Sequence, residues 1–185
     1  MALTKTPVCD FGKKAEDFKL KSINNKVITL DDIKGEKATL IMFICNHCPY
    51  VKAIIKDLTK DCNELKKDGI SSVAIMSNDT KNYPEDSFEN MIKFADNNNF
   101  GNINYLFDGT QEIARKYGAV CTPDFFGYNK NLELQYRGRF RELKDLNPIN
   151  NGDSDLKIAL KMVAQTQKGP DEQIPSMGCN IKWFN

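Results

Sequence analysis

The stretch that most constrains this chain is a run of five apolar residues, 40–44, that leads directly into Cys45-Asn46-His47-Cys48. A segment with a helical apolar period begins at once after the second cysteine. A short run that is apolar on both sides suits a central strand covered by helices on both faces of a sheet. The stretch therefore predicts a buried strand, a Cys-x-x-Cys pair and a helix in direct succession.

The predicted helix is marked by a single apolar stripe that Gly69 brings to an end. The stripe consists of Val51, Ile54, Ile55, Leu58, Cys62 and Leu65, spaced three and four residues apart. Cys62 lies on this stripe, and we expect it to be a buried, unreactive small hydrophobe.

The position of the two motif cysteines favours sulfur chemistry. A thiolate is the reactive form of cysteine, and a free cysteine with a pKa of about 8.5 is mostly protonated near neutral pH. The unpaired N–H groups and dipole of a helix N-terminus favour the thiolate. His47, between the sulfurs, can add a charge or a hydrogen bond. Cysteines at this spacing can also close a small disulfide, so we take Cys45, His47 and Cys48 as candidate catalytic residues.

Two other interpretations of the motif are a structural cysteine pair and half of a zinc site. A zinc site would need a second ligand pair at similar spacing. His47 is the only histidine in the sequence, and no second Cys-x-x-Cys follows. The sequence therefore indicates no metal site and no cofactor.

Composition narrows the class of protein. A chain of 185 residues suits a single domain, residues 1–185. The net charge of +1 offers no electrostatic case for binding nucleic acid or an anionic membrane. A short basic run, Arg137, Arg139 and Arg141, is expected on the solvated face of an edge strand.

No apolar run has the length of a membrane span, and the N-terminus has no signal-peptide core, so we expect a cytoplasmic protein. Six cysteines are too few for a disulfide scaffold, and in a reducing compartment Cys-x-x-Cys favours catalysis.

The remaining patterns predict an α/β fold. We expect a hairpin over residues 18–30, a polar connection over 31–37, strands near 72–77 and 105–107, and a β-hairpin over 125–137. A helix is expected after each inner strand. The short helix after residues 105–107 has Thr110 as its N-cap, and the final helix of the chain has Asp153 or Ser154 as its N-cap. Residues 168–185 show no period and are expected to form a C-terminal tail. This order predicts a central mixed sheet with helices on both faces.

Two motifs together resemble the thioredoxin-like superfamily: Cys45-Asn46-His47-Cys48 after a buried strand, and Thr122-Pro123 at the start of a later strand. In that superfamily the proline is cis, packs beside the redox cysteines, and adjoins backbone that pairs with a bound thiol substrate. The resemblance implies that Pro123 is cis, that Thr122 faces Cys45, and that both bind substrate.

The N-terminal hairpin and the approach through Lys34-Gly35-Glu36-Lys37 resemble the redoxin branch, the alkyl hydroperoxide reductase/thiol-specific antioxidant group. A peroxiredoxin-like subgroup is similar over nearly the whole chain. The similar stretches are residues 43–50, 121–126, 136–139 and 175–183.

The chain departs from true peroxiredoxins at the residues that orient peroxide. Those enzymes carry a Thr three residues before a Cys-Pro pair, and an Arg across the pocket. Here Cys48-Pro49 matches the pair, but Cys45 stands in place of the Thr, and the Arg position falls at Thr122. The chain also departs from thioredoxins, which lack a proline after the motif. Pro49 suits the first helical position and would make Cys48 the N-cap.

The remaining cysteines are weaker candidates. Cys121 precedes Thr122-Pro123, and it is either an additional redox thiol or a passive neighbour. Cys179 can be a remote resolving cysteine, but a tail thiol held by the packing of Trp183 is favoured. Cys9 lies in the N-terminal segment and is expected to be incidental.

These features support three functional hypotheses. The leading one is a thiol–disulfide oxidoreductase in which Cys45 attacks a protein or small-molecule disulfide, Cys48 resolves it, and an external dithiol reduces the enzyme. The first alternative is an antioxidant peroxidase that uses Cys48, with Cys45, Cys121 or Cys179 resolving. The third is a Cu(I)-handling protein, since soft thiolates bind Cu(I). Copper-delivery proteins of this fold space their cysteines three apart and add a distant His, and both features are absent from this sequence.

Overall fold

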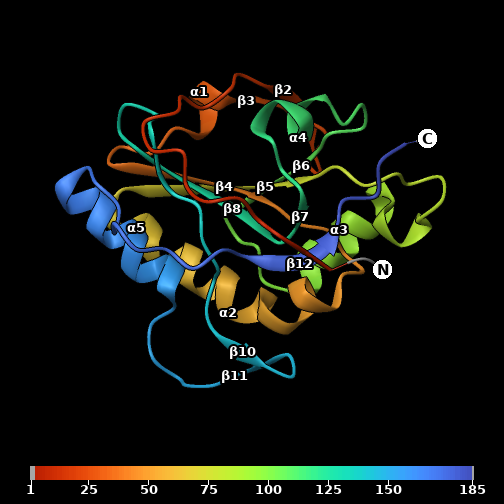
Figure 1. The fold of residues 1–185 in the computed structure, drawn as a ribbon. Helices are drawn as coiled ribbons and strands as arrows, with labels where there is room; N and C mark the ends of the chain where they lie inside the picture. The colour runs from red at the N-terminus through yellow and green to blue at the C-terminus, as the bar shows by residue number, and fades with distance from the viewer. Residues whose placement is uncertain (1–2, 185) are drawn as a thin grey trace.

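A computed structural model of the chain describes residues 3–184 and places a sheet between layers of helices (Figure 1). The strands are β1 (Leu3–Lys5), β2 (Lys19–Ser22), β3 (Val27–Thr29), β4 (Ala38–Phe43), β5 (Ile70–Met76), β6 (Asn104–Phe107), β7 (Cys121–Thr122), β8 (Asp124–Asn129), β9 (Leu134–Tyr136), β10 (Leu143–Lys144), β11 (Asn147–Pro148) and β12 (Met177–Asn180). The α-helices are α1 (Leu30–Ile33), α2 (Pro49–Leu65), α3 (Phe88–Asn97), α4 (Glu112–Tyr117) and α5 (Asp155–Thr166). Two 3₁₀ helices are η1 (Lys66–Asp68) and η2 (Pro84–Asp86).

The main sheet has seven strands in the order β3-β2-β6-β5-β4-β8-β9. β4 pairs in parallel with β5, and β5 with β6, whereas every other neighbouring pair in this sheet is antiparallel. Each residue of β4 is buried, as a central strand with both faces covered requires. The predicted α/β class with a mixed central sheet is confirmed.

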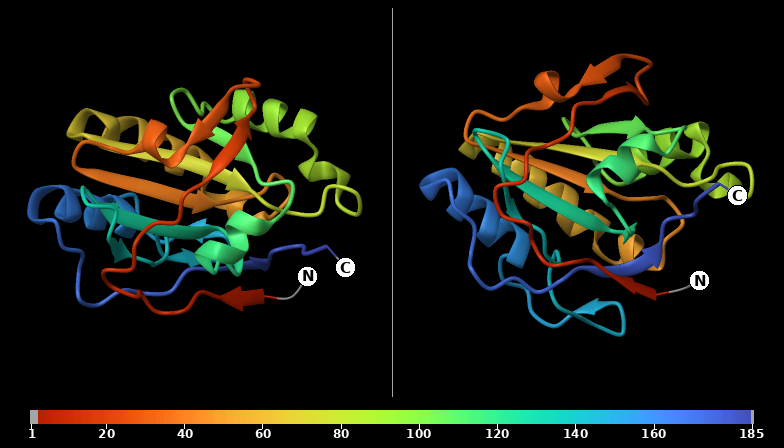
Figure 2. Two further views of the ribbon diagram at one scale, coloured as in Figure 1. Left: turned by 90° about the horizontal axis from the view of Figure 1, so that it is seen from above. Right: turned by 45° about the horizontal axis from the view of Figure 1, so that its top comes forward.

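Helices cover the two faces of the sheet unequally (Figures 1 and 2). On one face α2 and α5 contact each other and the sheet, and α3 packs beside them against β6. On the other face lie α1 and α4. Alternate residues of β4 face the two layers, with Leu40 and Met42 on the α2 side and Ile41 and Phe43 on the other. Burial of each such apolar side chain contributes about 1.5–3 kcal/mol.

The long helix α2 has the predicted phase. All six residues of its apolar stripe are buried, Cys48 is its N-cap and Pro49 its first residue. After the 3₁₀ turn η1, Gly69 adopts a φ of 77°, a left-handed conformation that suits glycine. The cysteines are therefore fixed at the N-terminus of a well-anchored helix.

Two local predictions are wrong. Where a polar connection is expected, Thr29 and Asp32 form a reciprocal capping box that starts the short helix α1. The N-cap of α4 is Gln111, with a φ of 63°, rather than Thr110. By contrast, Ser154 caps α5 as predicted, and its hydroxyl accepts from the Lys157 amide.

The C-terminal segment contains a strand, although its sequence shows no period. β12 lies between β1 and β7 in a separate three-stranded sheet, antiparallel to both. In Figure 1 this blue strand lies beside the red N-terminal strand, near the N-terminus of α2, and β12 contacts α2. The partners of β12 are distant in sequence, and its order depends on them.

The expectation that the basic run lies on a solvated face is wrong for Arg137. This side chain is 8% exposed, and its guanidinium donates to both carboxylate oxygens of Asp124 at 2.9 and 3.3 Å. It also donates to the Gly118 carbonyl at 2.7 Å. Asp124 begins β8 directly after Pro123, so the buried ion pair fixes the backbone next to the Thr122-Pro123 turn. Within residues 3–184, no helix is long and apolar enough to cross a membrane.

We predict that Cys62 resists alkylation in the folded protein. Its side chain is 3% exposed, and burial raises the pKa of its thiol to about 12. Iodoacetamide labelling followed by mass spectrometry should modify Cys62 only after unfolding, whereas the half-buried Cys9 serves as the more accessible reference. Rapid labelling of Cys62 under native conditions would show that the α2 stripe does not face the core.

Candidate functional site

The candidate site forms where β4 ends and α2 begins. Cys45 and Cys48 are 1% and 0% exposed, respectively, so the pair lies under other parts of the chain. All six cysteines lie within the described residues, and all are free thiols.

A buried carboxylate holds the loop between the two cysteines. Asp86, the last residue of η2, accepts from the backbone amides of Asn46 and His47 at 2.8 and 3.3 Å through Oδ1. Its Oδ2 accepts from His47 Nδ1 at 2.6 Å and from Asn78 Nδ2 at 2.8 Å. These contacts fix the backbone of the motif and the orientation of its histidine.

Asn46 is fixed as well, by a residue of β6 and by a second residue of η2. The Tyr105 hydroxyl of β6 donates to Asn46 Oδ1 at 2.9 Å, and Asn46 Nδ2 donates to the Glu85 carbonyl at 3.1 Å. Sequence reasoning missed Asp86, Asn78 and Tyr105. Asn78 follows β5 and Tyr105 lies in β6, whereas Asp86 lies in η2, and no spacing in the sequence links the three to the motif.

His47 is held between Asp86 and an aromatic ring. Its ring stacks on Tyr83 with centroids 5.6 Å apart and planes 7° from parallel. The hydrogen bond to Asp86 raises the pKa of His47 above its ordinary value of 6.5, although burial opposes this shift. His47 therefore stays protonated to a higher pH than a free histidine.

The Thr122-Pro123 peptide bond is cis, and Thr122 faces Cys45, as the resemblance implies. Thr122 Oγ1 lies 3.3 Å from Cys45 Sγ. The Thr122 carbonyl oxygen lies 3.1 Å from Cys48 Sγ. A single residue thus contacts both sulfurs of the motif.

Cys48 has the lowered pKa of the two motif sulfurs. A hydrogen bond from Cys45 is the largest cause, burial opposes it, and the Cys179 thiol and amide with the Val51 amide lower the value further, to about 5. The same hydrogen bond raises the pKa of Cys45, and burial and the Asp86 charge add to the increase. The Thr122 carbonyl favours a protonated Cys48, whereas the unpaired N–H groups and dipole at the N-terminus of α2 favour its thiolate. These groups favour Cys48, rather than Cys45, as the thiolate.

Cys179 lies at the site rather than in a remote tail. Its Sγ is 3.2 Å from Cys48 Sγ. Burial and the hydrogen bond with Cys48 raise the pKa of Cys179 to about 12. The favoured expectation that Trp183 holds this thiol by packing is wrong, because Cys179 contacts Cys48 while Trp183 lies under the Arg115 guanidinium, 4.3 Å from it.

The other two candidate thiols are less well placed. Cys121 is buried, and its Sγ contacts the Pro123 carbonyl at 3.6 Å. Burial raises the pKa of Cys121, and no hydrogen bond within residues 3–184 links it to another sulfur. Cys9 is half-buried, and burial raises its pKa to about 11.

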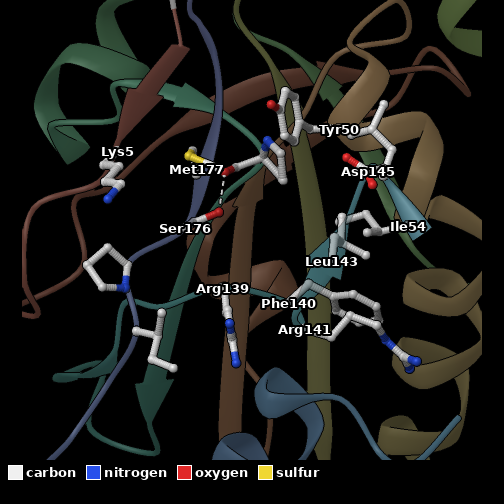
Figure 3. Close-up of a pocket in the computed structure, with 14 residues that line it drawn as sticks. Lys5, Tyr50, Ile54, Arg139, Phe140, Arg141, Leu143, Asp145, Ser176 and Met177 are labelled. Carbon is white, nitrogen blue, oxygen red and sulfur yellow. Dashed lines mark hydrogen bonds between the residues drawn. The ribbon is translucent and has the colours of Figure 1, made fainter. Parts of the chain in front are cut away.

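A cavity of about 460 Å³ adjoins the site through Pro123 (Figure 3). Tyr50 and Ile54 of α2 form one wall, and Ser176 and Met177 approach from the other side. Ser176 Oγ donates to the Pro123 carbonyl at 2.8 Å. Its further lining residues are Lys5, Arg139, Phe140, Arg141, Leu143, Asp145, Leu146, Ile174 and Pro175. The apolar and cationic lining suits a substrate segment placed beside the cysteines.

One group of potential metal ligands occurs within the described residues. Potential ligand atoms of Cys45, His47 and Asp86 lie within 4.8 Å of one another. Both Asp86 oxygens and His47 Nδ1 are already engaged in hydrogen bonds. Through these hydrogen bonds, His47 and Asp86 support the loop in an arrangement that requires no ion.

Comparison with protein families places this geometry in a known context. Residues 11–140 match the model of the AhpC/TSA family. The chain belongs to this family. The match spans the hairpin, the cysteine motif and the Thr122-Pro123 turn, and it establishes the redoxin branch of the thioredoxin-like superfamily.

Two solved structures are similar over almost their whole length. An uncharacterised conserved protein from Geobacillus kaustophilus is 40% identical with a TM-score of 0.94, covering 100% of this chain and 97% of its own. A hypothetical protein from Sinorhizobium meliloti is 36% identical with a TM-score of 0.90, covering 98% of both chains. The thioredoxin domain of a thiol-disulfide oxidoreductase from Bacteroides vulgatus shares the fold, at 17% identity and a TM-score of 0.58, over 69% of this chain and 86% of its own. No curated protein matches the chain.

We predict that the pKa of His47 depends on Asp86. In the wild type the single histidine should titrate above 6.5, and Asp86→Asn should lower its pKa because burial remains while the attraction is lost. Proton NMR follows this directly through the one histidine Hε1 resonance. Equal titration curves for the two proteins would contradict the assigned role of Asp86.

We also predict a thiolate at Cys48 under mildly acidic conditions. Ultraviolet thiolate absorbance of the reduced protein should rise near pH 5, the pKa of Cys48. Cys48→Ser should remove this step, and Cys45→Ala, which leaves no donor at position 45, should raise its midpoint by about one pH unit, because the largest hydrogen-bond contribution is lost. A step that survives in Cys48→Ser but disappears in Cys45→Ala would assign the thiolate to Cys45.

Proposed function

We propose that this protein is a thiol–disulfide oxidoreductase in which Cys48 is the nucleophile and Cys45 the resolving thiol. Family membership and the fold support redox chemistry at the motif. The observation that carries the proposal is the position of Cys48 as the N-cap of α2 with Cys179 Sγ 3.2 Å away, where the pKa of the Cys48 thiol is lowered while that of Cys45 is raised. The sequence alone suggests the opposite assignment of the two roles.

The proposed reaction follows from the two ionisation states. The Cys48 thiolate attacks one sulfur of a substrate disulfide, forms a mixed disulfide and releases the other substrate sulfur as a thiolate. Cys45 then loses its proton and attacks Cys48 Sγ, which releases the second substrate thiolate and leaves a Cys45–Cys48 disulfide. An external dithiol returns the protein to the reduced state.

The surrounding residues have supporting roles in this scheme. Thr122 contacts both sulfurs, and its hydroxyl can donate to Cys45 when that thiol ionises. His47, whose pKa Asp86 raises, is placed between the cysteines and in its protonated form can stabilise the negative charge that moves between them. The adjoining cavity beside Pro123 offers space for the substrate segment that carries the disulfide.

Two single variants test the proposal in reduction of a model protein disulfide with a dithiol reductant. We expect Cys48→Ser to abolish turnover, and Cys45→Ser to lower it at least about tenfold, because the Cys45–Cys48 disulfide can no longer form. Cys9→Ser, outside the site, is the matched control. A Cys48→Ser protein that traps substrate through Cys45 would instead make Cys45 the nucleophile.

A thiol peroxidase is the second candidate, favoured by the low pKa of Cys48 and by Cys48-Pro49 at the start of α2. Peroxide needs donors that orient it, and no guanidinium among residues 3–184 hydrogen-bonds to Cys48. Arg137 is committed to Asp124 and the Gly118 carbonyl. We therefore expect slow consumption of hydrogen peroxide. Fast consumption that depends on Cys48 and persists in Cys45→Ser would favour the peroxidase.

A further inference from the structure

The strand β12 lies directly over the motif cysteines. One edge of β12 pairs with β1, where Cys179 is opposite Leu3, and the other pairs with β7, where Cys179 is opposite Thr122. The same Thr122 contacts both sulfurs of the motif. β12 therefore pairs directly with Thr122, the residue that contacts both motif sulfurs.

A glycine makes this close approach possible. A Cβ at Gly178 would lie 2.0 Å from the Thr122 carbonyl oxygen and 3.1 Å from Pro123 Cδ. Any other residue would push β12 away from the turn. The next residue, Cys179, points to the opposite side of the strand from position 178, and its sulfur contacts Cys48.

Three sulfurs thus meet around one thiolate. Cys48 Sγ contacts Cys179 Sγ at 3.2 Å, and the sulfurs of Cys45 and Cys48 both contact Thr122. Cys121, though adjacent to Thr122 in sequence, directs its sulfur to the Pro123 carbonyl instead. Cys179, rather than Cys121, is therefore the third thiol of this cluster, because its sulfur contacts Cys48.

Access to Cys48 requires part of this arrangement to move, because its side chain is 0% exposed. β4 belongs to the main sheet and α2 packs on it, whereas β12 lies in the separate sheet, with three register pairs to β1 and two to β7, and its Cys179 packs in the core cluster. A short strand pair of this kind opens at a lower free energy than the core. Opening here would also join the Pro123 cavity to the cysteines, because Ser176 and Met177 form one of its walls.

We propose that Cys179 is a third redox-active cysteine, carried by β12, which covers Cys48 and returns to resolve mixed disulfides formed there. The proposal rests on the proposed function and adds a second resolving thiol to it. After Cys48 forms a mixed disulfide with substrate, Cys179 attacks Cys48 Sγ while its proton passes to the leaving substrate sulfur, and a Cys48–Cys179 disulfide forms as the bond to substrate breaks. Cys45 then attacks Cys48 Sγ, which releases Cys179 and yields the Cys45–Cys48 disulfide that an external dithiol reduces.

Oxidised glutathione, a small-molecule disulfide, tests this step in the Cys45→Ser background. We expect release of two glutathione thiols per protein and a Cys48–Cys179 disulfide on mass-spectrometric mapping, because Cys179 replaces the bound glutathione. Cys45→Ser/Cys179→Ser should release one thiol and keep glutathione on Cys48. Cys45→Ser/Cys121→Ser is the matched control and should behave as Cys45→Ser does.

Two outcomes overturn different statements. Stable glutathione on Cys48 in the Cys45→Ser protein, with Cys179 still open to alkylation, would overturn the role of Cys179 and leave the proposed function intact. Failure of the wild type to form a Cys45–Cys48 disulfide with oxidised glutathione would contradict the proposed function, and a Cys48–Cys179 disulfide in Cys45→Ser would still support the third cysteine.

Gly178→Ala tests the cover itself in the otherwise unchanged chain. Its added Cβ should displace β12, raise the rate of Cys48 alkylation by about tenfold and decrease Cys48–Cys179 pairing in the Cys45→Ser background. Gly152→Ala is the control, because a Cβ there meets only Asn150 Oδ1 at 3.5 Å. An unchanged alkylation rate in Gly178→Ala would overturn the assignment of β12 as the cover.

Discussion

The buried Asp86 carboxylate is the interaction on which the site depends. It accepts from four donors: two backbone amides of the motif loop, the His47 ring and the Asn78 amide. A carboxylate removed from water is stable in the fold only when such donors replace its hydration. Asn78 extends the connection, because its Oδ1 accepts from the Lys182 amide at 2.9 Å. The loop that carries the cysteines and the segment that continues β12 are thus held by one hydrogen-bonded chain.

In the proposed reaction, the electrostatics of Cys48 affect the direction of electron flow. A folded-state pKa near 5, against an ordinary value of 9.0, stabilises the thiolate at every pH above about 5. The stabilisation grows with pH until the ordinary value is reached, and it belongs to the reduced form alone. A stabilised dithiol makes the corresponding disulfide a stronger oxidant. Burial of the thiolate under β12 meanwhile limits its encounters with small oxidants, since reactivity requires exposure as well as ionisation.

The sequence predicts those parts that depend on local patterns. The α2 stripe, its N-terminus at Cys48-Pro49, the cap at Ser154 and the central strand are all visible in residue spacing. The sequence also identifies the motif cysteines and the Thr122-Pro123 turn, the latter through a family resemblance. Asp86 is not predicted, because a polar residue after a proline has no periodic signal. Arg137 appears solvated in sequence, and only the folded chain brings Asp124 to it. Likewise, β12 becomes a strand through β1 and β7, partners that no local pattern in Met177–Asn180 reveals.

The close contact at Gly178 has a geometric consequence for the whole C-terminal segment. Side chains alternate along a strand, so a shift of β12 by one residue against β7 would turn the Cys179 sulfur to the opposite face. The residue that then faced Cys48 would carry no sulfur, because Gly178 and Asn180 flank the cysteine. Gly178 is the position at which β12 passes closest to the Thr122 carbonyl, and it fits there without displacing the turn. The contact between Cys179 and Cys48 therefore exists in only one register of β12 against β7. In that register three thiols lie together, and in either neighbouring register the site has only the two motif cysteines.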